Sequence, residues 1–206
     1  MCSTLVQSGE TLLATAVVTI YDSGGLPHHV KAVLDPCSTT SLITDNLIST
    51  LNLETSNRNT QINCVGETVV QSTKIINIIF HSIVRKNISF KVTCIILNQI
   101  TQRLPPFHLQ LETINLPKEF LLADSHFYKP SIIDLLLGAD IYYQLLIGDV
   151  YRVPGSFLTL VNTHLGHIVG GPIPTECISY HSISDNISSE DTCFQIQSFN
   201  STDTLL

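Results

Sequence analysis

The stretch that decides the fold runs from residue 30 to residue 44 and reads VKAVLDPCSTTSLIT. A short apolar strand ends at Leu34, Asp35 follows directly, and a polar loop leads into the apolar residues Leu42 and Ile43. A carboxylate at a strand end, held in a loop rich in hydroxyls, is a common way to position a catalytic acid. The same residues also suit an ordinary aspartate of an Asx-turn. This stretch alone therefore leaves both interpretations open.

A second stretch, residues 132–140 with the sequence IIDLLLGAD, is an apolar run closed by Gly138. Together with the Asp35 loop it resembles the retropepsin-like aspartic peptidases, most closely the peptidase domain of BEL/Pao-type retrotransposon polyproteins. In that family a strand ends in an aspartate inside a D-S/T-G-like loop, and an apolar-apolar-Gly segment follows much later. The resemblance covers residues 12–172, and the combined pattern is more specific than the Asp35 loop alone. Three further segments match it: residues 121–124 (LLAD), 151–155 (YRVPG) and 163–172 (THLGHIVGGP).

The resemblance implies an all-β fold with few short helices: an acid-protease-like closed β-barrel, with one lobe per chain. Residues 12–174 would form the peptidase domain, preceded by an N-terminal lead of residues 1–11. Residues 103–131 contain four prolines and are expected to form an ordered insertion before the strand that carries LLLG. Residues 175–206 are rich in Ser, Thr, Asn and Asp, a composition typical of a disordered tail or linker.

Asp35 is the one aspartate in a suitable context, so the resemblance implies that the second catalytic carboxylate is Asp35 of another copy. The expected protein is a homodimeric endopeptidase that acts on a polypeptide substrate, as in the processing of a retrotransposon polyprotein. The other implied site residues are Pro36, Cys37, Ser38 and Thr39 as loop support, Val65, Gly66 and Glu67 as a flap, and Leu136, Leu137 and Gly138 as the structural apolar-Gly motif. We expect no cofactor and no metal, because the histidines and cysteines do not converge as zinc ligands do.

Two loop residues depart from the family pattern. The pattern has Ser or Thr directly after the aspartate and then Gly, whereas this chain has Pro36 and then Cys37. Pro36 has no hydroxyl and no amide hydrogen, so Ser38 or Thr39 would have to brace the two loops across a dimer. The Cys37 side chain is expected to strain a backbone suited to Gly, at about 1–3 kcal/mol, and to block its amide from the carboxylate. Two Cys37 thiols near a dimer axis could form a disulfide if their alpha carbons lie within about 4.4–6.8 Å. The alternative is a buried, inert thiol.

A competing aspartate, Asp22, begins the triplet Asp-Ser-Gly and fits a D-S/T-G search better than the Asp35 loop does. Glycines, a proline and two histidines follow it, which is typical of a hairpin turn. A catalytic loop of this fold is instead followed by an apolar segment that fixes it. We therefore interpret Asp22 as a turn residue and Asp35 as the catalytic candidate.

Two other functions stay open from the sequence. The chain could be a catalytically impaired peptidase-like domain that dimerises and holds extended peptide by strand addition. It could also be a small β-barrel that carries an apolar ligand. This last interpretation predicts a closed monomer with an interior cavity and no exposed Asp35.

Composition bounds the class of partner. The chain has 206 residues, 44% of them hydrophobic and only 13% charged, with a net charge of −7. The negative charge argues against a nucleic-acid partner, and no apolar run approaches the length of a membrane span. Since no secretory signal is apparent and the six cysteines lack C-x-x-C spacing, we expect an intracellular, cytoplasmic protein with reduced thiols.

Hydrophobic periodicity predicts the local elements. Alternation over residues 12–21 predicts a strand with one buried side. Asp45 is expected to cap a helix ending at Leu51, and Asp140 one ending at Leu146, with a structural role for Asp140. The other predicted strands are residues 30–34, 60–64, 68–76, 74–83, 88–97 and 132–137, with a last group within residues 150–169.

Overall fold

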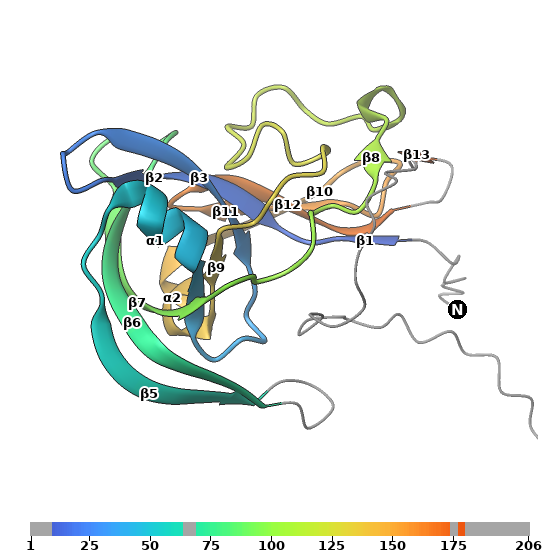
Figure 1. Ribbon diagram of the computed structural model, residues 1–206. Helices are drawn as coiled ribbons and strands as arrows, with labels where there is room; N and C mark the ends of the chain where they lie inside the picture. Colours follow the sequence, from blue (N-terminus) through green and yellow to red (C-terminus); the bar gives the residue numbers. More distant parts are fainter. Residues whose placement is uncertain (1–9, 64–68, 174–176, 180–206) are drawn as a thin grey trace, which may run out of the picture.

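A computed structural model describes residues 10–63, 69–173 and 177–179 of this chain. Six strands form a closed barrel in the order β2-β3-β9-β4-β7-β6, because β6 also pairs with β2 (Figure 1). The predicted all-β, closed-barrel fold class is therefore confirmed. The barrel strands are β2 (Thr15–Tyr21), β3 (Pro27–Leu34), β9 (Leu135–Leu137), β4 (Ser41–Thr44), β7 (Ser89–Leu97) and β6 (Val69–Ser82).

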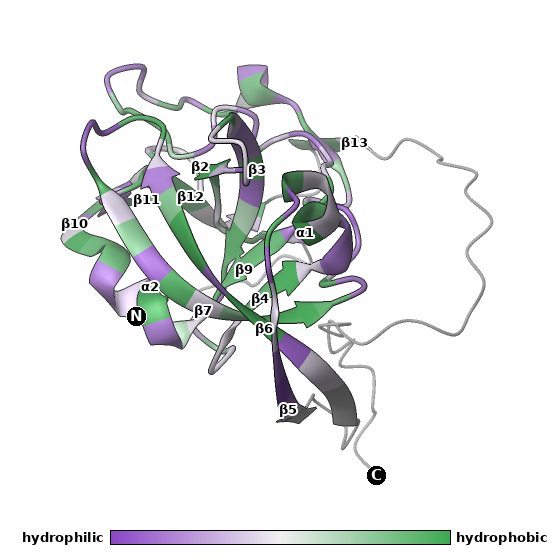
Figure 2. Ribbon diagram, turned by 60° about the vertical axis from the view of Figure 1, so that its left-hand side comes forward, coloured by the Kyte–Doolittle hydropathy of each residue, from purple (hydrophilic) through white to green (hydrophobic). Residues whose placement is uncertain are grey.

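The barrel interior is packed with apolar side chains rather than left open. Inward-facing residues alternate along the strands, and β-branched and aromatic residues fill these positions because they pack well on a pleated surface. Figure 2 shows β4 and β9 as predominantly hydrophobic. The buried core residues on β2, β6, β7 and β9 include Val18, Ile20, Ile78, Phe80, Val92, Cys94, Leu135 and Leu137.

The three strands β3, β9 and β4 place the Asp35 loop. β3 and β4 are joined by this loop but do not pair with each other, because β9 lies between them. β9 runs parallel to β3 and antiparallel to β4. All three β9 residues are buried, as expected for a strand covered on both faces. The strand is shorter than predicted, however, since Ile132 lies outside it and is 58% exposed.

A second, four-stranded sheet packs beside the barrel in the order β1-β12-β11-β10. Its core also contains residues of the proline-containing insertion, which is ordered between residues 103 and 131 as predicted. The elements outside the barrel are β1 (Glu10–Leu12), β5 (Ser56–Asn63), β8 (His108–Leu109), the 3-10 helix η1 (Leu111–Thr113), β10 (Leu146–Arg152), β11 (Thr159–Thr163), β12 (Gly166–Ile173) and β13 (Ile178–Ser179).

The predicted strand over residues 12–21 is wrong in two respects. Leu12 belongs to β1, and the barrel strand β2 begins only at Thr15. The polar side is not exposed either, since Thr15 and Thr19 are both buried. For Thr15 the reason is that the insertion lies against its side chain: the Thr15 hydroxyl donates to Oδ2 of Asp124 at 2.7 Å.

Two short helices follow the barrel strands, as predicted, but their first residues differ. Helix α1 (Asp45–Leu51) is capped by Thr44, whose hydroxyl accepts from the amide of Leu47 at 3.3 Å, and not by Asp45. Helix α2 (Ala139–Leu145) has Gly138 at its N-cap position and ends one residue before Leu146. Asp140 therefore lies in the first turn of α2 and is not its cap.

The predicted hairpins are confirmed. β5 and β6 pair antiparallel, and so do β6 and β7. The two strands predicted over residues 68–76 and 74–83 form the single strand β6, which is 14 residues long. It is long enough to pair with β5 near its start and with β7 and β2 near its end.

The described part of the chain extends beyond the expected boundaries of the domain. At the N-terminal side, β1 begins at Glu10 and pairs with β12. At the C-terminal side, β13 pairs with β8, so residues 178 and 179, assigned to the tail, belong to the folded part. Most of the predicted tail, residues 180–206, lies outside the described residues. No helix within the described ranges is long and apolar enough to cross a membrane.

Candidate active site

Asp35 lies immediately after β3, at the point where the chain leaves the barrel. Its amide donates to the carbonyl of Leu137 at 3.0 Å, which extends the pairing of β3 with β9 by one residue. Its carboxylate Oδ1 accepts a hydrogen bond from the amide of Cys37 at 2.9 Å. Asp35 is half-buried. The backbone of this acid is thus fixed by the barrel, while its carboxylate remains accessible at the barrel end.

The residues after Asp35 form a tight turn, in which the amide of Ser38 donates to the carbonyl of Asp35 at 3.3 Å. The fixed φ of Pro36 suits the second position of such a turn, and an aspartate is favoured at the first. The hydroxyl of Ser38 donates to the carbonyl of Thr40 at 2.7 Å, while Thr39 is exposed. Of the two hydroxyls considered as braces across a dimer, that of Ser38 is therefore already used within its own chain.

The expected obstruction by Cys37 is wrong. Among the described non-glycine residues, only Asn52 and Asn87 have a positive φ, so Cys37 does not occupy a backbone conformation that requires glycine. Its amide reaches the Asp35 carboxylate despite the side chain. The thiol is exposed and not buried. A disulfide between two Cys37 residues stays a prediction.

Gly138 is the residue on which the loop rests. A Cβ added at this position would lie 2.6 Å from the carbonyl oxygen of Thr40 and 2.9 Å from that of Ser38. The next amide, that of Ala139, donates to the Ser38 carbonyl at 2.7 Å. Only glycine allows the backbones to approach this closely. The Asp35 loop and the Leu136-Leu137-Gly138 motif are therefore in direct contact.

Hydrogen bonds between Ser41 and Asp140 join the start of β4 to the start of α2. Ser41 was not identified from the sequence. The Ser41 hydroxyl donates to Oδ1 of Asp140 at 2.7 Å, and its amide donates to Oδ2 at 3.1 Å. The same hydroxyl oxygen accepts from the amide of Gly138 at 3.1 Å. The predicted structural role of Asp140 is thus confirmed. One available signal was that a serine beginning a buried apolar run needs hydrogen-bond partners.

The flap residues Val65, Gly66 and Glu67 lie outside the described residues. The hairpin that would carry them is present, because β5 and β6 pair up to Asn63 and Val69. In Figure 1 this hairpin extends beyond the barrel, and the loop between its strands is drawn in grey. Any contact of the flap with Asp35 stays a prediction.

The competing aspartate, Asp22, lies at the other end of β3, in the turn that connects β2 to β3. Its Oδ1 accepts from the amides of Gly24 and Leu26, and its Oδ2 contacts Nε2 of His28 at 2.9 Å. The hydrogen bond from His28 is the main cause that lowers the pKa of Asp22 below its usual value. The predicted hairpin turn is confirmed, and these bonds account for the aspartate without a catalytic role.

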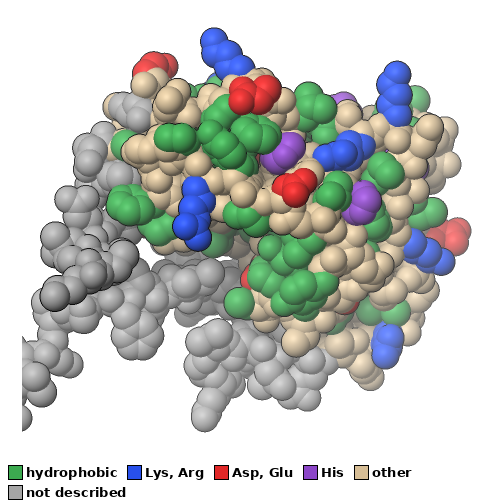
Figure 3. Space-filling model, turned by 180° about the vertical axis from the view of Figure 1, so that it is seen from behind, with side chains coloured by type: hydrophobic (Ala, Val, Ile, Leu, Met, Phe, Trp, Pro, Cys, Tyr) green, Lys and Arg blue, Asp and Glu red, His purple; other side chains and the backbone are tan. Residues whose placement is uncertain are grey.

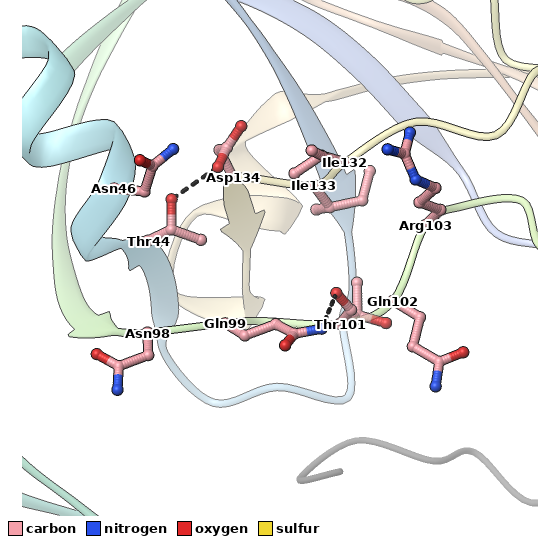
Figure 4. A pocket seen from close by; sticks show the side chains of 10 residues that line it. All are labelled: Thr44, Asn46, Asn98, Gln99, Thr101, Gln102, Arg103, Ile132, Ile133 and Asp134. Carbon is pink, nitrogen blue, oxygen red and sulfur yellow. Dashed lines mark hydrogen bonds between the residues drawn. The ribbon is translucent and has the colours of Figure 1, made fainter. Parts of the chain in front are cut away.

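A hollow of about 340 Å³ opens on the surface near Asp134, which directly precedes β9 (Figure 4). Asp134 lies beside it, where its Oδ1 accepts from the hydroxyl of Thr44 at 2.7 Å. None of the predicted site residues lines this hollow, so it is separate from the candidate active site. Its lining consists of Thr44, Asn46, Asn98, Gln99, Thr101, Gln102, Arg103, Ile132, Ile133 and Asp134.

No group of three or more His, Cys, Asp or Glu side chains in residues 10–63, 69–173 and 177–179 is placed to hold a metal ion. Comparison with known proteins gives no family: no protein-family model matches the chain, and no curated protein matches it at a significant level. Inference about function therefore depends on the Asp35 loop, the motif that ends in Gly138, and the contacts between them.

Proposed function

We propose that this chain is one half of an aspartic endopeptidase, and that Asp35 from each of two copies forms the catalytic pair. Two carboxylates held close together share one proton, because both cannot remain ionised at that distance. The ionised carboxylate takes a proton from a water molecule between them, and this water attacks the peptide carbonyl. The other carboxyl donates its proton to the carbonyl oxygen. The pair titrates as a unit, so neither pKa belongs to one residue.

The observation that carries this proposal is the interlocking of the Asp35 loop with Gly138. A catalytic carboxylate needs a backbone that does not move during the reaction. Here the loop is fixed by the bond from Asp35 to Leu137, by the bond from Ala139 to Ser38, and by a glycine that admits no side chain. An ordinary surface turn needs none of these long-range contacts, which favours a site over a simple connection.

The substrate class follows from the chemistry and from the resemblance. A carboxylate pair activates water for attack on an amide, and the expected flap between β5 and β6 would suit an extended polypeptide. The resemblance to BEL/Pao peptidases narrows this to the processing of a retrotransposon polyprotein. The Pro36-Cys37 departure does not remove the amide that contacts the carboxylate, so it leaves the proposed acid in a usable position.

Peptide hydrolysis at mildly acid pH tests the proposal, using a peptide library read by mass spectrometry, with and without pepstatin. The wild type and an Asp22→Asn control should cleave and be inhibited, whereas Asp35→Asn should lose roughly 10²–10⁴-fold in rate. The two variants make the same change of carboxylate to amide at two aspartates near opposite ends of β3. Cleavage that persists in Asp35→Asn would contradict the proposal.

Mixing experiments test whether the pair spans two copies. If each active pair needs one Asp35 from each chain, equal amounts of wild type and Asp35→Asn, refolded together, leave about a quarter of the dimers fully wild type. Activity should then fall to about a quarter of that of the same total amount of wild type. A fall only to half would mean that each chain acts alone.

A second candidate function is a peptide-binding module without cleavage. It is favoured by Pro36, which removes the hydroxyl that the family pattern has after the aspartate, and by the use of the Ser38 hydroxyl within its own chain. In this case the wild type and Asp35→Asn would bind extended peptides equally well, and neither would cleave them.

A further inference from the structure

The edge strand β10 is unusually uncovered for a strand of a folded domain. It is the last strand of the four-stranded sheet, with a pairing partner on one side only. Residues 147–150 are all exposed, so both of its faces are open as well as its outer edge. Ordering backbone costs about 1–2 kcal/mol per residue, and this segment buries little to offset that cost.

Three of the exposed side chains on and beside β10 are large and apolar. Tyr143 on α2 is 66% exposed, Ile147 at the start of β10 is 43% exposed, and Val150 is 61% exposed. We refer to these three residues as the α2–β10 patch. Helix α2 lies at the back of the molecule in Figure 1, and hydrophobic side chains gather on that face in Figure 3. Apolar groups concentrated on an unprotected edge mark an interaction surface.

The charge of this segment fits a second copy of the chain. Residues 143–152 contain one acid, Asp149, and one base, Arg152, and are therefore neutral, whereas the whole chain carries −7. Two like-charged copies meet with least repulsion through a neutral face. In a two-fold dimer the same patch meets itself, so a neutral segment meets an equally neutral one.

The patch is also continuous with the candidate active site. Helix α2 begins at Ala139, whose amide donates to Ser38 in the Asp35 loop, and Tyr143 lies one turn further along this helix. A second copy that packs on this face would contact α2. The same helix contacts the Asp35 loop, which has to meet the Asp35 loop of the second copy in the proposed active site. The register of β10 with β11 shifts between Leu146 and Val150, which favours side-chain packing over a continuous strand ladder.

From these observations we propose that the α2–β10 patch is the surface through which two copies of this chain associate. This inference deepens the proposed function and rests on it for the identity of the partner. Sedimentation velocity of the full chain over a wide range of concentration tests it. The wild type should dimerise, and Tyr143→Asp/Val150→Asp should dissociate with a dissociation constant raised by about a hundredfold or more. The matched control Leu26→Asp changes a residue 65% exposed in the β2–β3 turn and should dimerise like the wild type.

Hydrogen exchange provides a second measurement that does not depend on the variants. Amides of residues 143–152 in the wild type should gain protection as its concentration rises. A wild type that remains monomeric, or a double variant that dimerises as well as Leu26→Asp, would contradict the proposal that two copies associate through the α2–β10 patch. If dimers form through the patch but cleavage does not depend on Asp35, this inference stands and the proposed peptidase fails. If cleavage depends on Asp35 while the double variant still dimerises, the peptidase stands and the patch is wrong.

Discussion

Replacing Gly138 by alanine tests the contact on which the candidate site depends. The backbone at Gly138 has φ −84°, which any residue can adopt, so alanine causes no conformational strain there. Its methyl group would instead meet the carbonyl oxygens of Thr40 and Ser38 at 2.6 and 2.9 Å. Both neighbours are backbone atoms and cannot rotate away. The loop and the Gly138 segment must therefore separate.

The energetic cost of this separation has two sources, steric overlap and weakened hydrogen bonds. Overpacking against a fixed neighbour costs about 1–3 kcal/mol. Separation also weakens two hydrogen bonds, from Ala139 to Ser38 and from Gly138 to Ser41, each worth roughly 0.5–1.5 kcal/mol. The lower entropy of the unfolded alanine chain returns about 0.4–1 kcal/mol. We therefore expect Gly138→Ala to lower the free energy of unfolding by about 2–4 kcal/mol.

Urea unfolding measures this change, and Gly24→Ala is the matched control. Gly24 also lacks a positive φ, but a Cβ there would meet only the end of the Asp22 side chain, at 3.3 Å. Its free energy of unfolding should change by less than about 1 kcal/mol. Hydrogen exchange in Gly138→Ala should rise first in residues 36–41. If Gly138→Ala is as stable as Gly24→Ala, the close approach of Gly138 to the loop is wrong.

The remaining predictions concern three charged or ionisable sites. Lys31→Met should cost about 3–5 kcal/mol in urea unfolding, because its Nζ lies 3.0 Å from Oδ2 of the buried Asp124 and the variant leaves that charge unpaired; a loss below about 1 kcal/mol would contradict this. The folded-state pKa of Asp22 is lowered, chiefly by the hydrogen bond from His28, so its contribution to stability is present above the unfolded pKa of about 3.9 and is lost as pH falls through the folded pKa. The difference in stability between wild type and Asp22→Asn should therefore shrink at acid pH, and a constant difference would contradict it. Burial raises the pKa of the Cys94 thiol, so iodoacetamide at pH 8 should modify the exposed Cys37 and leave Cys94 unmodified in the folded chain, as mass spectrometry would show.

The sequence identified the parts of the site that depend on local patterns. An apolar run followed by Asp35, and a second apolar run closed by Gly138, predicted a strand end and a buried strand at the positions where β3 and β9 are found. That the Gly138 motif and the Asp35 loop would be neighbours was implied by the resemblance to the peptidase family and not by either run alone.

The parts that were missed depend on contacts between distant residues. Ser41 and Asp140 are 99 positions apart, and nothing near Ser41 in the sequence identifies its partner. The second face of β2 looked solvent-exposed because its covering segment, around Ala123, comes more than 100 residues later. Periodicity reports which side chains of one strand are alike. It does not report what a later segment places over them.

The error at Cys37 shows how a family pattern can mislead. A glycine in a motif is often taken to mean a left-handed backbone, so a cysteine in its place suggested strain. In this chain Pro36 sets up a turn in which the third residue needs no positive φ, and the Cys37 amide still donates to Asp35. Pro36 and Cys37 together therefore form the turn without the left-handed backbone conformation that a glycine would allow. What they change is the hydroxyl that the family pattern has after the aspartate.

If two copies pair as proposed, we expect any loss of activity to arise in that pairing and not in the folding of one copy. Within its own chain, Asp35 is held by contacts with Leu137, Cys37 and the Gly138 segment. We expect these contacts to hold the acid in a single copy, whereas the proposed chemistry needs two acids. Folding and activity should consequently separate on dilution: the barrel persists after the second carboxylate has left. A chain that unfolded as its activity disappeared would instead obtain the rigidity of its loop from the partner.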